Sequence, residues 1–227
     1  MRKRKVKQMF NKIIGKEKIS DLLKDNMTIM IGGFIGCGSP DKLIDILLEK
    51  GVKDLTVIAN DTAFTDRGLG RLIVAKQVSR VIVSHIGTNP ETGKQMFEGL
   101  LKVDLVPQGT LVERIRCGGS GLGGFLTPTG VGTIVEEGKQ KMTVDGVDYL
   151  LEMPLRAELA LIFGSTVDKA GNVVYNATTR NFNPIMAMAA DTVIVEAQKL
   201  VEIGDIQPEL VMTPSPLITH IYAPEKQ

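Results

Sequence analysis

A run of glycines near the start of the chain is the stretch whose residue types point most directly to chemistry. Residues 32–38 contain four glycines, and they follow the apolar segment Thr28–Ile31. Glycine allows backbone N–H groups to approach a ligand closely, and the start of a helix attracts negative charge. A helical pattern begins at Pro40, with Ser39 before it as a candidate cap. We therefore expect an anionic group to bind at this loop.

Two nucleotide-binding motifs are excluded by the residues around the glycines. A Walker loop needs Lys followed by Ser or Thr after its last glycine, whereas Ser39 follows Gly38. The dinucleotide fingerprint would require glycine where Asp41 stands. The later run Gly119–Gly124 does match G-x-G-x-x-G, but it follows a helical pattern instead of a strand. Tight turns without a ligand are the alternative interpretation of both loops.

Other reactive side chains favour less specific interpretations. Cys37 lies in the glycine loop, where a helix start would lower the pKa of its thiol, so a cysteine nucleophile is one alternative. Neither histidine lies near it in sequence, and His85 is more typical of a loop hydrogen bond than of a catalytic base. Adjacent Glu136 and Glu137 precede a glycine and indicate a solvated turn, because neighbouring side chains diverge.

The elements that would hold these residues alternate between short strands and helices. β-Branched or apolar runs at 28–31, 55–58, 81–83 and 103–106 predict strands, and the segments between and after them, at 40–50, 69–75, 92–100 and 110–116, have helical spacing. This order predicts an α/β fold with an open, mainly parallel sheet and flanking helices. Asp145-Gly146 predicts a β-hairpin, so a small antiparallel section is expected as well. Further strands are predicted at 159–163 and 192–196, around a helix at 184–190.

Composition and charge limit the classes of protein to which the chain can belong. Of its 227 residues, 43% are hydrophobic and 23% are charged, which is typical of a folded protein. The first 18 residues hold eight Lys or Arg against one Glu, so we predict a basic tail at 1–15 before a single domain at 16–227. A membrane-surface segment, a nucleic-acid-binding segment or a transit peptide is the alternative for this tail, but the acidic remainder disfavours nucleic acid.

The same numbers bear on compartment and on metals. No apolar run is long enough to cross a bilayer, and only two cysteines are present, so neither a disulfide framework nor a four-cysteine zinc site can form. We expect a cytoplasmic protein without a metal centre and without a membrane partner.

The stretch from Asp25 to Pro40 resembles the first signature of the family I coenzyme A-transferases, in which Gly-Gly-Phe lies between an apolar strand and a Gly-x-Pro ending. The resemblance continues through five more segments, so it covers nearly everything after the basic tail. These segments are 59–62, 84–90, 106–110, 126–133 and 180–183. Within the family, the chain is most similar to the α subunits of bacterial acetate/acetoacetate or butyrate/acetoacetate enzymes.

The resemblance implies a mechanism divided between two subunits. Family members transfer coenzyme A between carboxylic acids through a glutamate of a Ser-Glu-Asn-Gly motif on the β subunit, and no Glu-Asn-Gly triplet occurs in this chain. By the same resemblance, Gln108 in Pro-Gln-Gly-Thr stabilises the oxyanion. The coenzyme A-binding segment would consist of Gly32, Gly33, Phe34, Ile35, Gly36, Cys37 and Gly38.

The resemblance also implies a coenzyme A-transferase-like fold, an α2β2 assembly and a coenzyme A thioester that enters as a substrate, with no permanently bound cofactor. Acetate, butyrate and acetoacetate are the acids implied. Gly118–Gly124 is expected to line the cleft or a subunit interface. For Gln108, a hydrogen bond to the backbone at a helix start is the alternative role. For the whole chain, the alternatives are a sugar-phosphate-binding or isomerase-like domain and a non-catalytic subunit of a complex.

Overall fold

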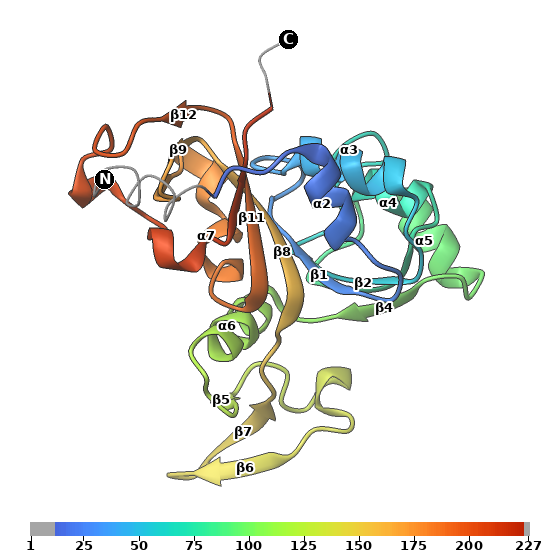
Figure 1. Cartoon of the computed structure of the whole chain (residues 1–227). Coiled ribbons are helices and arrows are strands. Elements are labelled where there is room, and N and C mark those ends of the chain that lie inside the picture. Colours follow the sequence, from blue (N-terminus) through green and yellow to red (C-terminus); the bar gives the residue numbers. More distant parts are fainter. Residues whose placement is uncertain (1–11, 225–227) are drawn as a thin grey trace.

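A seven-stranded sheet forms the centre of the molecule (Figure 1) in the computed structural model, which describes residues 12–224. The strand order is β13-β11-β8-β1-β2-β3-β4, and every neighbouring pair is parallel. The predicted mainly parallel sheet is therefore confirmed. Its strands are β1 (Thr28–Ile31), β2 (Leu55–Ile58), β3 (Val78–Val83), β4 (Lys102–Leu105), β8 (Ala157–Gly164), β11 (Ala190–Ala197) and β13 (His220–Tyr222).

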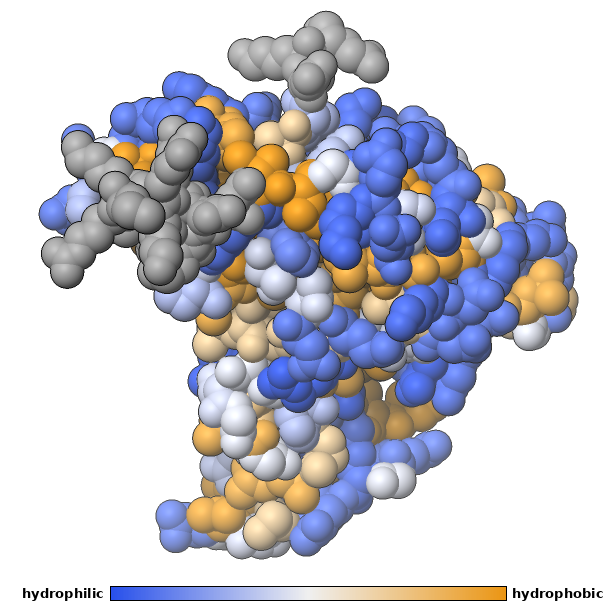
Figure 2. Space-filling view, in the orientation of Figure 1, coloured by the Kyte–Doolittle hydropathy of each residue, from blue (hydrophilic) through white to orange (hydrophobic). Residues whose placement is uncertain are grey.

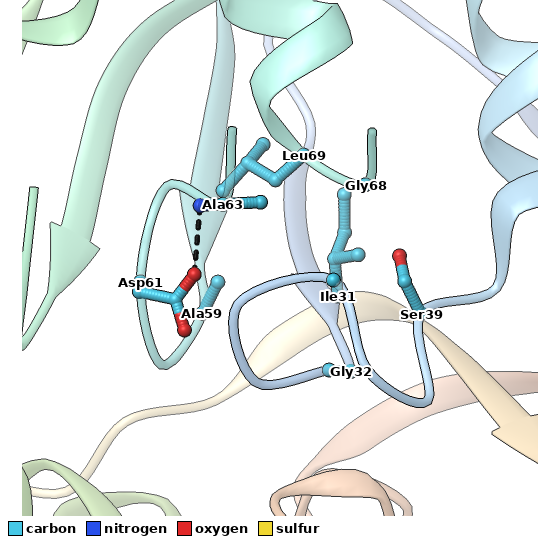
Figure 3. Close-up of a pocket in the computed structure, with 10 residues that line it drawn as sticks. Ile31, Gly32, Ser39, Ala59, Asp61, Ala63, Gly68 and Leu69 are labelled. Atoms are coloured by element: carbon cyan, nitrogen blue, oxygen red, sulfur yellow. Dashed lines mark hydrogen bonds between the residues drawn. The ribbon is translucent and has the colours of Figure 1, made fainter. Parts of the chain in front are cut away.

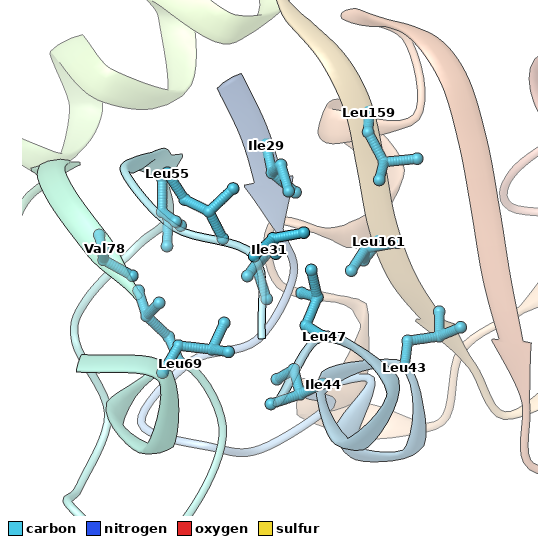
Figure 4. Close-up of a cluster of buried hydrophobic side chains, with 14 of the residues drawn as sticks. Ile29, Ile31, Leu43, Ile44, Leu47, Leu55, Leu69, Val78, Leu159 and Leu161 are labelled. Carbon is cyan, nitrogen blue, oxygen red and sulfur yellow. The ribbon is translucent and has the colours of Figure 1, made fainter. Parts of the chain in front are cut away.

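Helices cover both faces of this sheet, and a separate hydrophobic cluster fills each interface. Ile29 and Ile31 of β1 point into the cluster beneath α3 (Figure 4), whereas Met30 between them belongs to the other cluster, which includes residues of α6 and α7. A strand that is buried on both faces reads as a continuous apolar run, as β1 does. The helices are α2 (Lys16–Leu22), α3 (Asp41–Lys50), α4 (Gly70–Val74), α5 (Pro90–Phe97), α6 (Gln108–Gly119) and α7 (Asn183–Met186).

The predicted helices form, but their boundaries differ from the prediction, and two of the differences have a clear structural reason. The helix predicted at 184–190 ends at Met186, because the chain turns at once into β11, which begins at Ala190. The helix predicted from Pro40 begins at Asp41, with Pro40 as its N-cap residue and no side-chain cap hydrogen bond. The predicted capping role of Ser39 is therefore wrong.

Two small sheets accompany the central one. The predicted hairpin forms β6 (Lys141–Val144) and β7 (Val147–Glu152), which join β5 (Phe125–Thr127) in an antiparallel arm that projects from the body (Figure 1). Apolar side chains are exposed on this arm (Figure 2), among them Met142, Val144 and Val147. The sequence did not predict the other sheet, which consists of β9 (Thr166–Asp168), β10 (Val173–Val174) and β12 (Leu200–Val201). Short 3₁₀ helices lie at Ile134–Glu136, Ala177–Arg180, Pro208–Leu210 and Ser215–Leu217.

The first described residues pair with the sheet. Ile14 N–H donates to Ile221 O (3.0 Å), and Ile221 N–H donates to Lys12 O (2.8 Å), so this segment lies along β13. The other residues of the predicted basic tail, 1–11, lie outside the described residues. Within residues 12–224, no helix is long and apolar enough to cross a membrane.

The topology identifies one place where loops converge. The chain builds outward from β1 through β2, β3 and β4, and then continues on the other side of β1 with β8. In open parallel sheets, ligands bind at the carboxyl ends of strands beside such a reversal. The glycine loop follows β1, Asn60 and Asp61 follow β2, and Gln108 lies three residues after Leu105, the last residue of β4. These three resemblance segments therefore lie at the same edge of the sheet.

Candidate active site

The glycine loop forms a tight turn whose backbone is largely bonded within the chain. Phe34 and Cys37 exchange two backbone hydrogen bonds (3.0 and 2.9 Å). Gly33 N–H donates to Asn181 Oδ1 (3.2 Å), and Ile35 N–H donates to Asp61 Oδ2 (2.8 Å). Among the described residues, only the amides of Gly36 and Gly38 in the 32–38 loop lack an acceptor. The loop therefore offers a ligand fewer amides than its glycines led us to expect.

Close packing, as well as access for a ligand, requires glycine at Gly32 and Gly38. A Cβ at Gly32 would lie 1.8 Å from Asn183 Oδ1. At Gly38, where φ is +66°, a Cβ would lie 2.8 Å from the backbone of Thr179. Both glycines thus let the loop contact the segment from Thr178 to Asn183 directly.

Asn181 and Asn183, which lie just before and at the start of α7, hold the glycine loop with their side-chain amides. Asn181 Nδ2 donates to Cys37 O (3.0 Å), and Asn183 Nδ2 donates to Gly38 O (3.0 Å). Asn183 Oδ1 also accepts from Phe163 N–H (2.9 Å), which ties the loop to β8. The sequence contained both asparagines within a resemblance segment but gave no sign of this role, because their partners lie about 145 residues away.

The start of α3 already has an acidic partner within the chain. The carboxyl group of Glu196, at the end of β11, accepts from Lys42 N–H (2.8 Å) and Leu43 N–H (2.9 Å). Burial raises the pKa of this carboxyl group to about 7, although the two N–H donors act in the opposite direction. The first N–H groups of this helix are therefore occupied by a carboxyl group of the protein itself, and an anionic ligand at the glycine loop stays a prediction.

Gln108 is the first residue of α6, and its side chain is exposed at the edge of the sheet. Its Nε2 donates to Asn60 Oδ1 (2.7 Å). Asn60 is buried, and its Nδ2 donates to Asp61 Oδ2 (2.7 Å). Asp61 in turn accepts from the glycine loop at Ile35, so a chain of hydrogen bonds connects the two predicted parts of the site. The alternative of a hydrogen bond from the Gln108 side chain to the backbone is wrong.

A small cavity lies between the glycine loop and the loop after β2 (Figure 3). Its volume is about 10 Å³, which is enough for one water molecule, and Ser39, Asp61 and Gly68 are among its lining residues. Ser39 Oγ is buried and has no hydrogen-bond partner in the described part of the chain. A bound water would satisfy this hydroxyl group.

A second turn, Phe64–Arg67, lies beside the glycine loop and resembles it in form, since a backbone bridge closes each turn. The Arg67 guanidinium lies 5.2 Å from the centre of the Phe64 ring, and a Cβ at Gly36 would lie 2.8 Å from Arg67 Cδ. Phe34 and Phe64 are both partly exposed. The two turns therefore lie against each other at Gly36 and Arg67, an arrangement that the sequence did not indicate.

The remaining candidates do not form a second reactive centre. Cys37 Sγ lies 3.3 Å from Thr178 Oγ1, a hydroxyl group and not a base. His85 is exposed, and its backbone carbonyl accepts from Thr62 N–H. Glu136 lies in a short 3₁₀ helix, where it accepts from Gly132 N–H (2.7 Å). No group of three or more His, Cys, Asp or Glu side chains that could hold a metal is found in residues 12–224.

The G-x-G-x-x-G match has a structural explanation. Gly118 and Gly119 end α6, where a Cβ would lie 2.0 Å from Leu155 O and 2.5 Å from Met188 Cβ, respectively. The run continues into β5 and not into a helix. Gly118 and Gly119 therefore allow close packing, and the match that begins at Gly119 is not a dinucleotide fingerprint.

Comparisons with known proteins agree with the motifs. A family model described as coenzyme A transferase matches residues 14–224. The α subunit of acetate CoA-transferase from Escherichia coli K12 is 58% identical over 213 residues, which is 94% of this chain and 97% of that protein. The α subunit of acetoacetyl-CoA:acetate/butyrate CoA transferase from Clostridium acetobutylicum is 57% identical over 94% of this chain and 98% of that protein.

A solved structure with the same fold is an acyl-CoA transferase from E. coli O157:H7 in a thioester complex with CoA. It superposes with a TM-score of 0.83 at 20% identity and covers 95% of this chain. The match spans 47% of that longer chain, so it supports the fold alone. The family model and the two close relatives confirm the resemblance that the motifs indicated, and the chain belongs to the coenzyme A transferase family.

Proposed function

We propose that this chain is the α subunit of an enzyme that moves coenzyme A between short-chain carboxylic acids, with acetate, butyrate and acetoacetate as the acids. Two relatives more than half identical along nearly their whole length carry these acids in their names. Both are α subunits, so we further propose that the chain acts with a β subunit, in an α2β2 assembly. The coenzyme A thioester would enter as a substrate and not as a resident cofactor.

The proposed chemistry requires a carboxylate nucleophile from the β subunit. That carboxylate attacks the thioester carbonyl, expels the coenzyme A thiolate and leaves an acyl-glutamyl anhydride. The thiolate then attacks the glutamyl carbonyl, which releases the first acid and forms a glutamyl-coenzyme A thioester. The second acid then attacks the glutamyl-coenzyme A carbonyl and expels the thiolate, which gives a new anhydride. The thiolate attacks the acyl carbonyl of this anhydride, so the new acyl-coenzyme A leaves and the glutamate carboxylate is restored. Each attack places negative charge on a carbonyl oxygen, and a fixed N–H donor stabilises that charge.

The observation that carries the proposal is that the Gln108 amide is anchored by one N–H group and exposed at the other. A carboxamide nitrogen has two N–H groups, and the bond to Asn60 uses one of them. The side chain is exposed at the edge of the sheet, so the other N–H remains available to an oxyanion. A neutral amide can donate there without protonating the nucleophile.

The glycine loop would hold the coenzyme A arm next to Gln108. We propose that the segment Gly32, Gly33, Phe34, Ile35, Gly36, Cys37 and Gly38 contacts this arm, with the free amides of Gly36 and Gly38 as its donors. A sugar phosphate fits less well, because Glu196 already occupies the N–H groups at the start of α3. Cys37 and Cys117 are both free, which is typical of a reducing compartment, and we propose that the protein acts in the cytoplasm.

The test is a coenzyme A transfer assay with the chain alone, with its β subunit, and with the Gln108→Ala variant in the complex. We expect turnover only in the complex, and a loss of about 10²- to 10³-fold in kcat for Gln108→Ala with little change in KM. Gly109→Ala is the matched control, since a Cβ at Gly109 meets no atom within 4 Å. Turnover by the isolated chain, or an unchanged kcat for Gln108→Ala, would contradict the proposal.

A further inference from the structure

The carboxylate of Asp61 lies at the junction between the glycine loop and the Gln108 side chain. It is 5% exposed and accepts three hydrogen bonds, from Ile35 N–H (2.8 Å), Ala63 N–H (2.7 Å) and Asn60 Nδ2 (2.7 Å) (Figure 3 shows the bond to Ala63). Movement of a buried carboxylate with three N–H donors is costly, because each donor would lose its acceptor.

Two of the three donors have unusual backbone conformations. The φ angles of Ile35 and Ala63 are +49° and +52°, in the left-handed region that residues other than glycine rarely adopt. A β-branched residue such as Ile35 is especially unfavourable there. Such conformations persist where the surrounding structure holds them, and the same carboxylate bonds to both N–H groups. Asp61 thereby shapes the glycine loop and its own loop together.

The third donor, Asn60 Nδ2, determines how the amide of Gln108 is oriented. A carboxylate oxygen that bonds to Asn60 accepts, so Asn60 must present its Nδ2 to Asp61. The Oδ1 of Asn60 then faces Gln108, and Gln108 must present its Nε2 and not its Oε1. An amide group can otherwise turn over with little change in shape. The acceptor-only chemistry of Asp61 therefore decides which end of the Gln108 amide is anchored.

We propose that Asp61 is a positioning residue for coenzyme A transfer, acting through Asn60 to orient the N–H donor of Gln108 and through Ile35 to hold the glycine loop. The inference rests on the proposed function and deepens it. Asp61 does not contact the reacting atoms in this arrangement. Its effect on kcat should therefore depend on the presence of Gln108, whereas its effect on the glycine loop should appear in KM in either background.

The experiment is a double-mutant cycle in the complex with the β subunit, with kcat and KM measured for wild type, Asp61→Asn, Gln108→Ala and the double variant. An asparagine at 61 has the same shape, but it can present either an acceptor or a donor to Asn60. We expect Asp61→Asn to lower kcat at least 10-fold in the wild-type background and less than 2-fold in the Gln108→Ala background. If Asp61→Asn lowers kcat by the same factor in both backgrounds, the two residues act independently and the inference is overturned.

Asp168→Asn is the matched control. The Asp168 carboxylate is also buried and accepts several N–H donors, at Ala170, Gly171 and Asn172, but it belongs to the sheet of β9 and has no bond to Asn60 or Gln108. We expect this variant to lower the melting temperature while kcat changes less than 2-fold in either background. A fall in kcat as large as that of Asp61→Asn would show that lost stability explains both, and would overturn the inference.

Asn60→Ser keeps the inference testable if Asp61→Asn does not fold. It removes the link to Gln108 and leaves the bonds of Asp61 to Ile35 and Ala63 in place. We expect a lower kcat, again only when Gln108 is present. If Gln108→Ala loses kcat while both other variants retain it, the positioning inference fails and the proposed function stands. If Gln108→Ala retains kcat, the proposed role of Gln108 fails, and the inference fails with it.

Discussion

Replacing Gly32 with alanine tests whether the contact between the glycine loop and Asn183 stabilises the protein. A Cβ at this position would lie 1.8 Å from Asn183 Oδ1 and 2.7 Å from its Cγ, so the asparagine side chain must leave its place. That side chain is fully buried, and in its three shortest hydrogen bonds it accepts from Phe163 N–H (2.9 Å) and donates to Gly38 O (3.0 Å) and Thr179 O (2.8 Å).

The expected loss follows from these three bonds. A net contribution of about 1 kcal/mol for each gives a decrease of about 3 kcal/mol in the free energy of unfolding. For a chain of 227 residues, this corresponds to a fall of about 6–12 °C in melting temperature. Thermal and urea unfolding of the purified variant, followed by circular dichroism, measure both quantities.

Gly93→Ala is the matched control for Gly32→Ala. Gly93 lies inside α5, and a Cβ there would meet no atom within 4 Å. Alanine is about 1 kcal/mol better than glycine in a helix, so this variant should be more stable than wild type. A Gly32→Ala protein within 1 kcal/mol of wild type would refute the argument, since it would mean that the loop and Asn183 separate without cost.

Two further predictions concern buried polar groups. Because burial raises the pKa of Glu196 from 4.5 to about 7, the folded protein keeps a proton that the unfolded chain releases, and this stabilising contribution is lost as pH rises from about 4.5 through 7. Across that window, we expect the free energy of unfolding of wild type to fall by up to about 3 kcal/mol relative to that of Glu196→Gln. Urea unfolding at several pH values measures both. If the difference between the two proteins stays constant with pH, the pKa shift is contradicted. Tyr175→Phe removes the hydrogen bond between Tyr175 Oη and Thr213 Oγ1 (2.8 Å), and both residues are buried. We expect this variant to lose about 1–2 kcal/mol of the free energy of unfolding in the same assay. An unchanged free energy of unfolding would mean that the bond contributes nothing.

The sequence predicted those parts of the fold that depend on local patterns. The apolar run of β1, the helical spacing of α3 and the Asp145-Gly146 turn each specify their element from neighbouring residues, and the structure confirms all three. β10 and β12 could not be predicted in this way, because two residues are too few to show a period.

The candidate site was predictable in position but not in its supporting contacts. Motifs singled out Gln108 and the glycine loop, and the structure places both at one edge of the sheet. The partners that fix them are Asn60, Asp61, Asn181 and Asn183, and the two last-named residues lie about 145 positions from the loop in the sequence. A glycine run indicates where a backbone can approach another group closely, but it does not indicate whether that group is a ligand or the same chain.

The pairing of Lys12–Ile14 with β13 has a consequence for the behaviour of the molecule in concentrated solution. A parallel sheet with seven strands has two lateral borders, and an uncovered border can recruit strands from other molecules. Here the N-terminal segment covers the outer side of β13, whereas β4 at the opposite border carries Lys102 and Asp104. Charged side chains discourage intermolecular strand pairing. Removal of residues before Ile19 would uncover the apolar border at Ile221 and favour self-association, so a truncated protein should begin ahead of Lys12.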